Sequence, residues 1–337
     1  MTGPDRPLAL SLGDPAGIGP ELACEAWAQR GSLDLPAFFV TGGAAVLAAA
    51  ARTRGIELPV ATIDQPDQAA AAFVNALPVL GGDEGEYAPG LPREAGARLA
   101  LQSLERATDL VRQRQASALV TMPVSKSELA AVGFDYPGQT EYMAQACGVT
   151  AADAVMMLSG PSLRTVPLTV HCSLAEVPRL LTTDLILRKG RIVATALRRD
   201  LGIESPRLAV CGLNPHAGES GRIGDEEERV IAPAIEALRE EGIEATGPHP
   251  ADAIFTHRAR ETYDVALAMY HDQALIPLKA LDFDEGVNVT LGLPIVRTSP
   301  DHGTAFSIAG EGIADPGATI AAIRMAGDMA GRRQARG

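Results

Sequence analysis

Short apolar runs alternate along the chain with longer stretches in which apolar residues recur every three or four positions. The longest such stretch, 93–115, places Leu101, Leu104, Ala107 and Val111 on one face and predicts a helix. Further helices are expected at 183–200, 225–241 and 318–329. Buried strands are expected at 8–12, 38–41, 59–63, 77–80, 118–122, 154–158, 164–170, 208–210, 265–269 and 286–291. This alternation predicts an α/β fold with a mostly parallel sheet covered by helices.

The bulk composition is that of an ordinary α/β protein and narrows the class of partner. The chain has 337 residues, of which 46% are hydrophobic, enough for one large domain or two modest ones. Its net charge of -13 argues against nucleic acid or an anionic membrane as the main partner. Basic groups need only cluster locally to bind a small anionic substrate.

Targeting and redox signals are weak in this sequence. The four cysteines show no Cys-x-x-Cys spacing, so neither a disulfide framework nor a thiolate zinc site is indicated. The start of the sequence lacks the basic and apolar regions of a signal peptide, and no run approaches the ~18 apolar residues of a membrane span. We therefore expect a cytoplasmic enzyme.

Three of the six histidines lie at or just beyond the ends of apolar runs: His171, His216 and His271. Ligands of open α/β sheets bind beyond the carboxyl ends of the strands. Three imidazoles that converge from separate strands suit Zn²⁺ or another borderline divalent metal, with one position left open for substrate. Three unrelated histidines in loops are the alternative.

Several polar side chains near these runs are candidates for substrate binding or proton transfer. Asp272 follows His271 directly, and Lys279 lies eight residues beyond that histidine. Asn288 lies in the last expected strand and Arg297 in a loop after it, so two cations and an amide are present for a phosphate or carboxylate, with plain surface solvation as the alternative.

Three further positions stand in loops or at helix starts. Thr140 is expected to cap a helix, and such a helix start can also bind phosphate. Asp252, between His249 and His257 in an expected loop, is a candidate carboxylate. The glutamates at 226–228 are expected to form a solvated helix start.

Glycine-rich turns occur near both ends of the chain. Gly13-Asp14-Pro15-Ala16-Gly17-Ile18-Gly19-Pro20-Glu21 predicts a strand-to-helix turn whose backbone N–H groups can receive a ligand, although it matches neither a Rossmann nor a P-loop motif. Taken jointly with 214–219, 268–273, 288–294 and 297–305, this turn resembles the 4-hydroxythreonine-4-phosphate dehydrogenase family of pyridoxal phosphate biosynthesis, over essentially the whole chain. The first motif and 302–316 are also similar to the wider β-decarboxylating dehydrogenases of the isopropylmalate dehydrogenase type.

The resemblance implies an α/β/α fold with the active site in a cleft between two subdomains. Residues 1–129 with 299–337 would form the cofactor side, and 130–298 the metal and dimer side. It implies a homodimer whose metal site is shared between subunits, with Zn²⁺, Mg²⁺ or Co²⁺ held by the three histidines named above. It also implies substrate contacts from Gln139, Thr140, Lys279, Asn288 and Arg297, and binding of NAD or NADP near Asp14, His302, Gly303 and Thr304.

The activity implied is oxidation of 4-phosphooxy-L-threonine to a 3-oxo acid, which then decarboxylates to 3-amino-2-oxopropyl phosphate. The metal would lower the free energy of the substrate alkoxide as hydride leaves for NAD. Lys279, Asp252 or Asp272 would handle the protons.

One departure from the family's pattern bears on the substrate. The family's Gly-His-Thr-Glu reads Gly138-Gln139-Thr140-Glu141 here, and Gln139 can hydrogen-bond substrate but cannot become cationic or shuttle a proton. The same reaction on threonate or erythronate phosphate, or on a dihydrodiol dicarboxylate from aromatic degradation, is therefore an alternative. Rivals of another class are a phosphate acyltransferase, which would leave the histidines unexplained, and a noncatalytic metal-binding protein.

Overall fold

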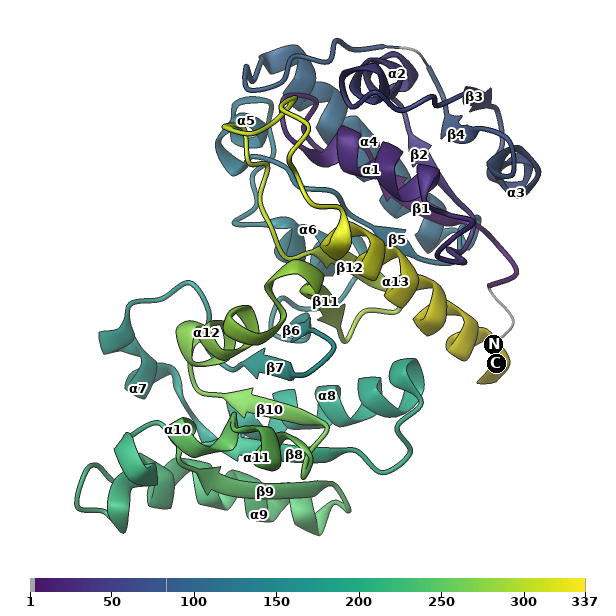
Figure 1. Cartoon of the computed structure of the whole chain (residues 1–337). Coiled ribbons are helices and arrows are strands. Elements are labelled where there is room, and N and C mark those ends of the chain that lie inside the picture. Colours follow the sequence, from purple (N-terminus) through teal and green to yellow (C-terminus); the bar gives the residue numbers. More distant parts are fainter. Residues whose placement is uncertain (1–3, 83, 337) are drawn as a thin grey trace. The chain divides into compact units, whose positions relative to one another are not determined.

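The computed structural model describes residues 4–82 and 84–336, and the chain forms two compact units (Figure 1). One unit comprises Met1–Ala151 and Leu293–Gly337, and the other comprises Ala152–Gly292. The functional division proposed above, at 129/130 and 298/299, stays a prediction.

The sheet of the first unit has the strand order β3-β4-β2-β1-β5-β12, and all its pairings are parallel. Most of its strand residues are buried, as the continuous apolar runs predict for a parallel sheet covered on both faces. Arg297 opens the last of these strands, so the expectation that it lies in a loop is wrong. The strands are β1 (Leu8–Ser11), β2 (Phe38–Thr41), β3 (Val60–Ile63), β4 (Leu77–Leu80), β5 (Leu119–Val120) and β12 (Arg297–Pro300).

Helices cover both faces of this sheet. The predicted amphipathic helix is confirmed as α4 (Glu94–Arg112), which packs against β1, β2 and β5. The closing helix α13 (Gly317–Arg336) packs against β12, β5 and β1. In Figure 1, α1 and α13 lie in front of the strands and α4 lies behind them. The remaining helices are α1 (Gly19–Ala28), α2 (Ala44–Thr53), η1 (Pro66–Gln68), α3 (Ala69–Phe73), α5 (Lys126–Ala131) and α6 (Gln139–Ala146).

The sheet of the second unit has the order β11-β6-β7-β10-β8-β9. The strands β7, β10, β8 and β9 are parallel, whereas β6 runs antiparallel to both β7 and β11. The fold is therefore α/β with a mostly parallel sheet, as predicted. The strands are β6 (Val155–Ser159), β7 (Arg164–Pro167), β8 (Arg207–Cys211), β9 (Glu244–His249), β10 (Val265–Ala268) and β11 (Val287–Leu291).

The helices of the second unit differ from expectation in three places. The stretch expected as one helix at 225–241 begins with a single π-helical turn, η4 (Glu227–Ile231), before α9 (Ala232–Glu240). The expected loop around Asp252 contains β9, α10 (Ala251–Ile254) and α11 (His257–Arg260) instead. His271 begins a helix, α12 (His271–Asp282), which packs against β7 and β10. The others are η2 (Leu174–Glu176), α7 (Val177–Leu180), α8 (Thr183–Leu201), η3 (Pro215–Glu219) and η5 (Phe283–Glu285).

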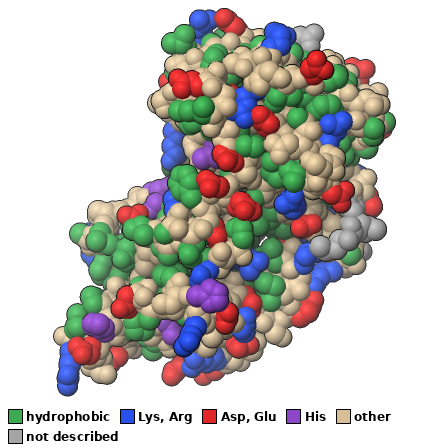
Figure 2. Space-filling model, viewed as in Figure 1, with side chains coloured by type: hydrophobic (Ala, Val, Ile, Leu, Met, Phe, Trp, Pro, Cys, Tyr) green, Lys and Arg blue, Asp and Glu red, His purple; other side chains and the backbone are tan. Residues whose placement is uncertain are grey.

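Within 4–82 and 84–336 no helix combines the length and the apolar character needed to span a membrane. All four cysteines are free thiols. On the face shown in Figure 2, acidic, basic and hydrophobic side chains are interspersed.

Candidate active site

The carboxyl ends of three adjacent parallel strands in the second unit carry the three predicted histidines. His171 follows β7, His271 follows β10, and His216 follows β8, and these strands are neighbours in the order β7-β10-β8. Because parallel neighbours end at the same edge of a sheet, the three connecting segments leave from one edge.

Two of these imidazoles lie close together. The ring centroids of His171 and His271 are 6.1 Å apart and their planes are inclined by 41°. Both rings line a pocket of about 270 Å³, together with Thr169, Val170, Cys172, Leu174, Val177, Tyr270 and Asp272. Bonds from imidazole nitrogen to zinc are about 2.0–2.1 Å long, so two rings at this separation are within reach of one ion.

Asp272 fixes the orientation of the second ring. The Nδ1 of His271 lies 2.7 Å from Oδ1 of Asp272. An ionised carboxylate only accepts hydrogen bonds, so Nδ1 is the donor in this contact, and in the neutral imidazole that tautomer leaves the lone pair on Nε2. Metal-binding histidines are commonly oriented by such a carboxylate contact.

Both His171 and His216 have backbone conformations that L residues rarely adopt. Their φ angles are +48° and +53°, in the left-handed region. Residues held in this region cost of order 1–3 kcal/mol each and cluster at functional sites. Two strained histidines at one edge of a sheet are therefore a structural indication of function.

A chain of buried hydrogen bonds connects the segments that carry the three histidines. The hydroxyl of Thr169 donates to the carbonyl of Met269 at 2.8 Å, which links the end of β7 to the end of β10. Gln273 accepts from the N–H of Met269 at 2.6 Å and donates to the carbonyl of Gly212 at 2.8 Å, which links β10 to β8. Thr169 and Gln273 are both buried, so these contacts fix the three segments relative to one another.

The loop that contains His216 is a run of consecutive left-handed residues within the η3 segment. The residues 216–220 all have positive φ, including Ala217 and Ser220. Gly218 has φ +77°, and a Cβ there would lie 2.6 Å from Oε2 of Glu227, so only glycine fits.

Glu227 holds this loop from beneath. Its side chain, with the residue only 3% exposed, accepts from the N–H groups of Leu213 (2.8 Å) and Asn214 (2.7 Å) and from Nδ2 of Asn214 (2.9 Å). Glu226 accepts from the same Asn214 amide at 2.7 Å. The expectation that Glu227 is part of a solvated helix start is wrong, because the π-helical turn points its carboxylate into the loop.

The third histidine is not brought to the other two within one chain. Across the described residues, no group of three or more His, Cys, Asp or Glu side chains is arranged to hold a metal ion. His216 is exposed. Asp252 is also exposed, in α10, which packs against the η3 segment that contains His216.

Two other predicted residues of the second unit, Lys279 and Asn288, lie on regular elements. Lys279 is partly buried on α12, about two turns beyond His271. Asn288 is partly buried on β11, and its Oδ1 has no hydrogen-bond partner among the residues described. A buried amide oxygen without a donor fits a ligand that supplies one.

In the first unit, Arg297 and Gln139 contact each other directly. Nη2 of Arg297 donates to Oε1 of Gln139 at 3.0 Å and to Oγ1 of Thr121 at 2.6 Å. Arg297 is 4% exposed, and burial lowers its pKa to about 10, so the guanidinium stays charged at neutral pH. This cation lies at the amino end of α6, where free N–H groups also favour an anion.

The start of α6 differs from expectation in its cap. Gly138, in an extended conformation, is the N-cap, and Thr140 lies inside the first turn, so the prediction of Thr140 as the cap is wrong. Lys126 lies at the same helix start, with Nζ 3.9 Å from a Cβ built on Gly138. Lys126 could not be predicted for this site, because no feature of the sequence pattern places α5 beside α6.

The predicted nucleotide residues also meet within the first unit. The N–H of Ile18 donates to the carbonyl of Thr304 at 3.0 Å, and a Cβ on Gly17 would lie 2.7 Å from that oxygen. Asp14 is buried and accepts from the N–H of Ala16 at 2.9 Å. Burial raises the pKa of Asp14, against the opposing effect of this hydrogen bond. His302 and Gly303 continue the same loop, with Nδ1 of His302 3.1 Å from the carbonyl of Gly303.

Known proteins resemble the chain over nearly its full length. The model of the family described as pyridoxal phosphate biosynthetic protein PdxA matches residues 34–326. The 4-hydroxythreonine-4-phosphate dehydrogenase of Erythrobacter litoralis is 62% identical over 333 residues, 99% of each chain. The crystal structure of the Klebsiella pneumoniae 4-hydroxythreonine-4-phosphate dehydrogenase matches with a TM-score of 0.84 and 37% identity, covering 96% of this chain and 98% of that one. A terephthalate 1,2-cis-dihydrodiol dehydrogenase from Burkholderia xenovorans matches with a TM-score of 0.65 and 31% identity, over 96% of this chain and 98% of that one.

The contacts of Glu227 generate a first prediction. In Glu227→Gln one side-chain oxygen is kept, but the new NH₂ group faces the NH₂ group of Asn214. Turning the Asn214 amide to avoid this clash would bring the Asn214 oxygen against the Glu226 carboxylate. We expect the free energy of unfolding to fall by about 1–3 kcal/mol, measured by denaturant titration. The neighbouring, exposed Glu228→Gln serves as the control and should stay within about 0.5 kcal/mol of the parent. Equal stabilities of the two variants would contradict this role of Glu227.

A second prediction concerns Lys189 on α8. Its Nζ donates to the carbonyl of Leu168, just before the segment with His171, at 2.9 Å. Burial lowers the pKa of Lys189 from 10.5 to about 8. Between these values the unfolded chain holds a proton that the folded chain has lost, so stability rises as the pH increases through this window. Relative to Lys189→Met, the parent should therefore gain stability from pH 8 to pH 10 in denaturant titrations. A constant difference across that range would refute the assignment.

Proposed function

Because the chain belongs to the PdxA family of pyridoxal phosphate biosynthetic proteins, we propose that it is a 4-hydroxythreonine-4-phosphate dehydrogenase that uses NAD or NADP. The reaction is oxidation of the hydroxyl of 4-phosphooxy-L-threonine to a 3-oxo acid, followed by loss of carbon dioxide to give 3-amino-2-oxopropyl phosphate. The observation that carries the proposal is the pair of imidazoles, His171 and His271, at the carboxyl ends of adjacent strands with Asp272 orienting one of them.

A divalent metal (Zn²⁺, Mg²⁺ or Co²⁺) supplies Lewis-acid stabilisation of negative charge on the substrate oxygen, and the nicotinamide supplies the hydride acceptor. His171, His271 and His216 would hold the metal. The donors fit this use, because the contact with Asp272 favours the neutral tautomer of His271 that has its lone pair on Nε2, and two of the three residues have the strained backbone typical of functional sites.

We further propose a homodimer in which one of the three ligands comes from the partner subunit. The second unit exposes several large apolar side chains, which is unusual for a surface facing water alone. Leu174, which lines the histidine pocket, is 67% exposed, and Ile276 on α12 is 65% exposed. A covering subunit would bury them and could deliver the third imidazole.

The remaining residues would bind and orient the substrate. Arg297 and Gln139 at the amino end of α6, with Thr140 and Lys126, supply a cationic group of donors for a phosphate or carboxylate. Asn288 offers an amide oxygen to a substrate donor.

Proton transfer and cofactor binding fall to other residues. Lys279 or Asp252 would move protons, whereas the contact of Asp272 with His271 favours an orienting role for that carboxylate. Asp14 and the loop of His302, Gly303 and Thr304 would hold the nucleotide. The backbone hydrogen bond between Ile18 and Thr304 supports this assignment, because it holds the two segments predicted to bind the nucleotide next to each other.

Gln139 keeps a second substrate open. Its amide oxygen is occupied by Arg297, which leaves its NH₂ group to donate to substrate, and an amide does so without a change of charge with pH. The alternative is the same reaction on a related hydroxy acid, such as a dihydrodiol dicarboxylate. The similarity to the 31% identical dihydrodiol dehydrogenase supports this alternative. Threonate or erythronate phosphate belongs to the same alternative.

A substrate panel tests the function. Formation of NADH or NADPH, followed by absorbance with 4-phosphooxy-L-threonine, the two sugar-acid phosphates and a dihydrodiol dicarboxylate, should give the highest kcat/KM for 4-phosphooxy-L-threonine. His216→Ala should abolish turnover by removing a metal ligand. The proposal fails if no member of the panel reduces the nicotinamide, or if chelator-stripped enzyme turns over at a near-normal rate.

Metal affinity gives a readout that does not depend on turnover. Asp272→Asn replaces the carboxylate that orients His271, and loss of such a partner typically costs 10–100-fold in metal affinity. Zinc titration calorimetry on the full chain should show that weakening, whereas Asp284→Asn, an exposed carboxylate in η5, should bind like the parent. Matching affinities for the two variants would rule out the orienting role.

A further inference from the structure

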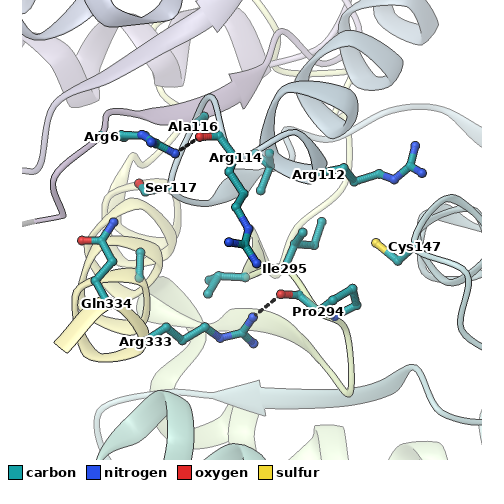
Figure 3. Close-up of a pocket in the computed structure, with 13 residues that line it drawn as sticks. Arg6, Arg112, Arg114, Ala116, Ser117, Cys147, Pro294, Ile295, Arg333 and Gln334 are labelled. Carbon is teal, nitrogen blue, oxygen red and sulfur yellow. Dashed lines mark hydrogen bonds between the residues drawn. The ribbon is translucent and has the colours of Figure 1, made fainter. Parts of the chain in front are cut away.

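A second pocket, in the first unit, is lined by four arginines. Its volume is about 520 Å³, within the range of small-molecule sites. Its charged lining residues are Arg6, Arg112, Arg114 and Arg333 (Figure 3). Ser117, Gln334 and Cys147 also line it, and its floor is apolar. No Asp or Glu is among the described residues that line it, although the whole chain has 42 Asp and Glu against 29 Lys and Arg.

The pocket lies at the amino ends of the strands of its unit. Arg6 precedes β1, Ser117 precedes β5, and Pro294 to Val296 precede β12. The residues proposed for substrate and nucleotide, such as Asp14 and Thr304, follow the carboxyl ends of β1 and β12. Since parallel strands separate these two edges, the arginine pocket is a feature distinct from those residues.

Two of the guanidinium groups donate hydrogen bonds to backbone carbonyls, which are neutral acceptors. Arg6 donates to the carbonyl of Arg114, and Nη1 of Arg333 donates to the carbonyl of Pro294 at 2.8 Å. Arg112 is paired with Asp109 at 3.0 Å, and in Figure 3 it extends away from Arg114. The described lining of the pocket therefore brings four guanidinium groups together without a lining carboxylate.

Arg114 is the most informative of the four. It follows α4 with φ +59°, a left-handed position at which glycine is preferred and another residue costs about 1 kcal/mol. Figure 3 shows its side chain pointing toward Arg333 across the pocket. Within residues 4–82 and 84–336, its guanidinium makes no hydrogen bond or ion pair. Stabilisation of helix carboxyl ends explains cations such as Arg112 and Arg333, but it does not explain Arg6, which lies on no helix.

We propose that this pocket binds a small anion that carries at least two phosphate or carboxylate groups. Arg114 and Arg333 are placed to take one anionic group between them, and Arg6 to take the other, each through the planar fork that guanidinium offers to such oxygens. Gln334 and Ser117 add neutral hydrogen-bonding groups, and the apolar floor suits the body of the ligand.

Two cysteines allow the proposal to be tested in one experiment. Cys147 lines the arginine pocket and Cys172 lines the histidine pocket, and both are partly exposed. Inorganic pyrophosphate is the probe, used with the full chain at low ionic strength and without added metal. The rates of alkylation of the two thiols are followed by peptide mass spectrometry. We expect saturable protection of Cys147 with little effect on Cys172.

The matched variants are Arg114→Gly and Arg258→Ala. The first removes the central guanidinium but suits a left-handed backbone, so its Tm should equal or exceed that of the parent. The second removes one charge from an exposed position on α11. Arg114→Gly should weaken pyrophosphate binding by at least about tenfold, a loss of about 1.4 kcal/mol, and Arg258→Ala should leave it unchanged. Absence of protection at Cys147, equal protection of both thiols, or an unaltered affinity in Arg114→Gly would each overturn the proposal.

Discussion

The histidine site depends on one constraint, the chain of buried hydrogen bonds that runs through Thr169, Met269, Gln273 and Gly212. A side chain such as Gln273, buried at 8% exposure, must have its hydrogen bonds satisfied, and leaving one unmade costs about 1–3 kcal/mol. Here both ends of its amide are satisfied by backbone groups of two different segments. Any displacement of one histidine-bearing segment against the next would break one of these contacts. The free-energy cost of leaving a buried group unsatisfied therefore restrains the relative positions of the segments that carry the histidines.

These restraints also allow the backbone to keep left-handed conformations that would otherwise be unfavourable. His171 and the run 216–220 hold left-handed backbones, which a free loop would relax. Hydrogen bonds to buried groups oppose that relaxation: Lys189 holds the carbonyl of Leu168, and Glu227 holds two N–H groups of the other loop. The strained backbone at the histidines is therefore maintained by the satisfied polar groups that lie beneath it.

Sequence reasoning succeeded where burial alone decides the outcome. Continuous apolar runs located the buried strands, and their ends located His171, His216 and His271, because a parallel sheet puts connecting segments at one edge. It failed where tertiary contacts decide. Glu226, Glu227 and Glu228 are identical in sequence, and only the π-helical turn selects the middle one for burial. The helix α12 contains Pro277 and β9 contains a Gly-Pro pair, so local propensity argues against both elements. Arg297 was expected in a loop because its charged side chain interrupts the apolar pattern by which a buried strand such as β12 is recognised.

Arg297 also shows why net charge is a poor guide to binding in this protein. A chain of charge -13 repels anions at long range, yet over distances beyond roughly a Debye length of 8–10 Å that field is screened by salt. What a ligand meets is the local set of groups: a buried guanidinium at the start of α6 in one place, and four arginines without a lining carboxylate in another. Local pairing therefore matters more than the total charge, since Asp109 offsets the charge of Arg112, whereas Gln139 and Thr121, which accept hydrogen bonds from Arg297, are neutral.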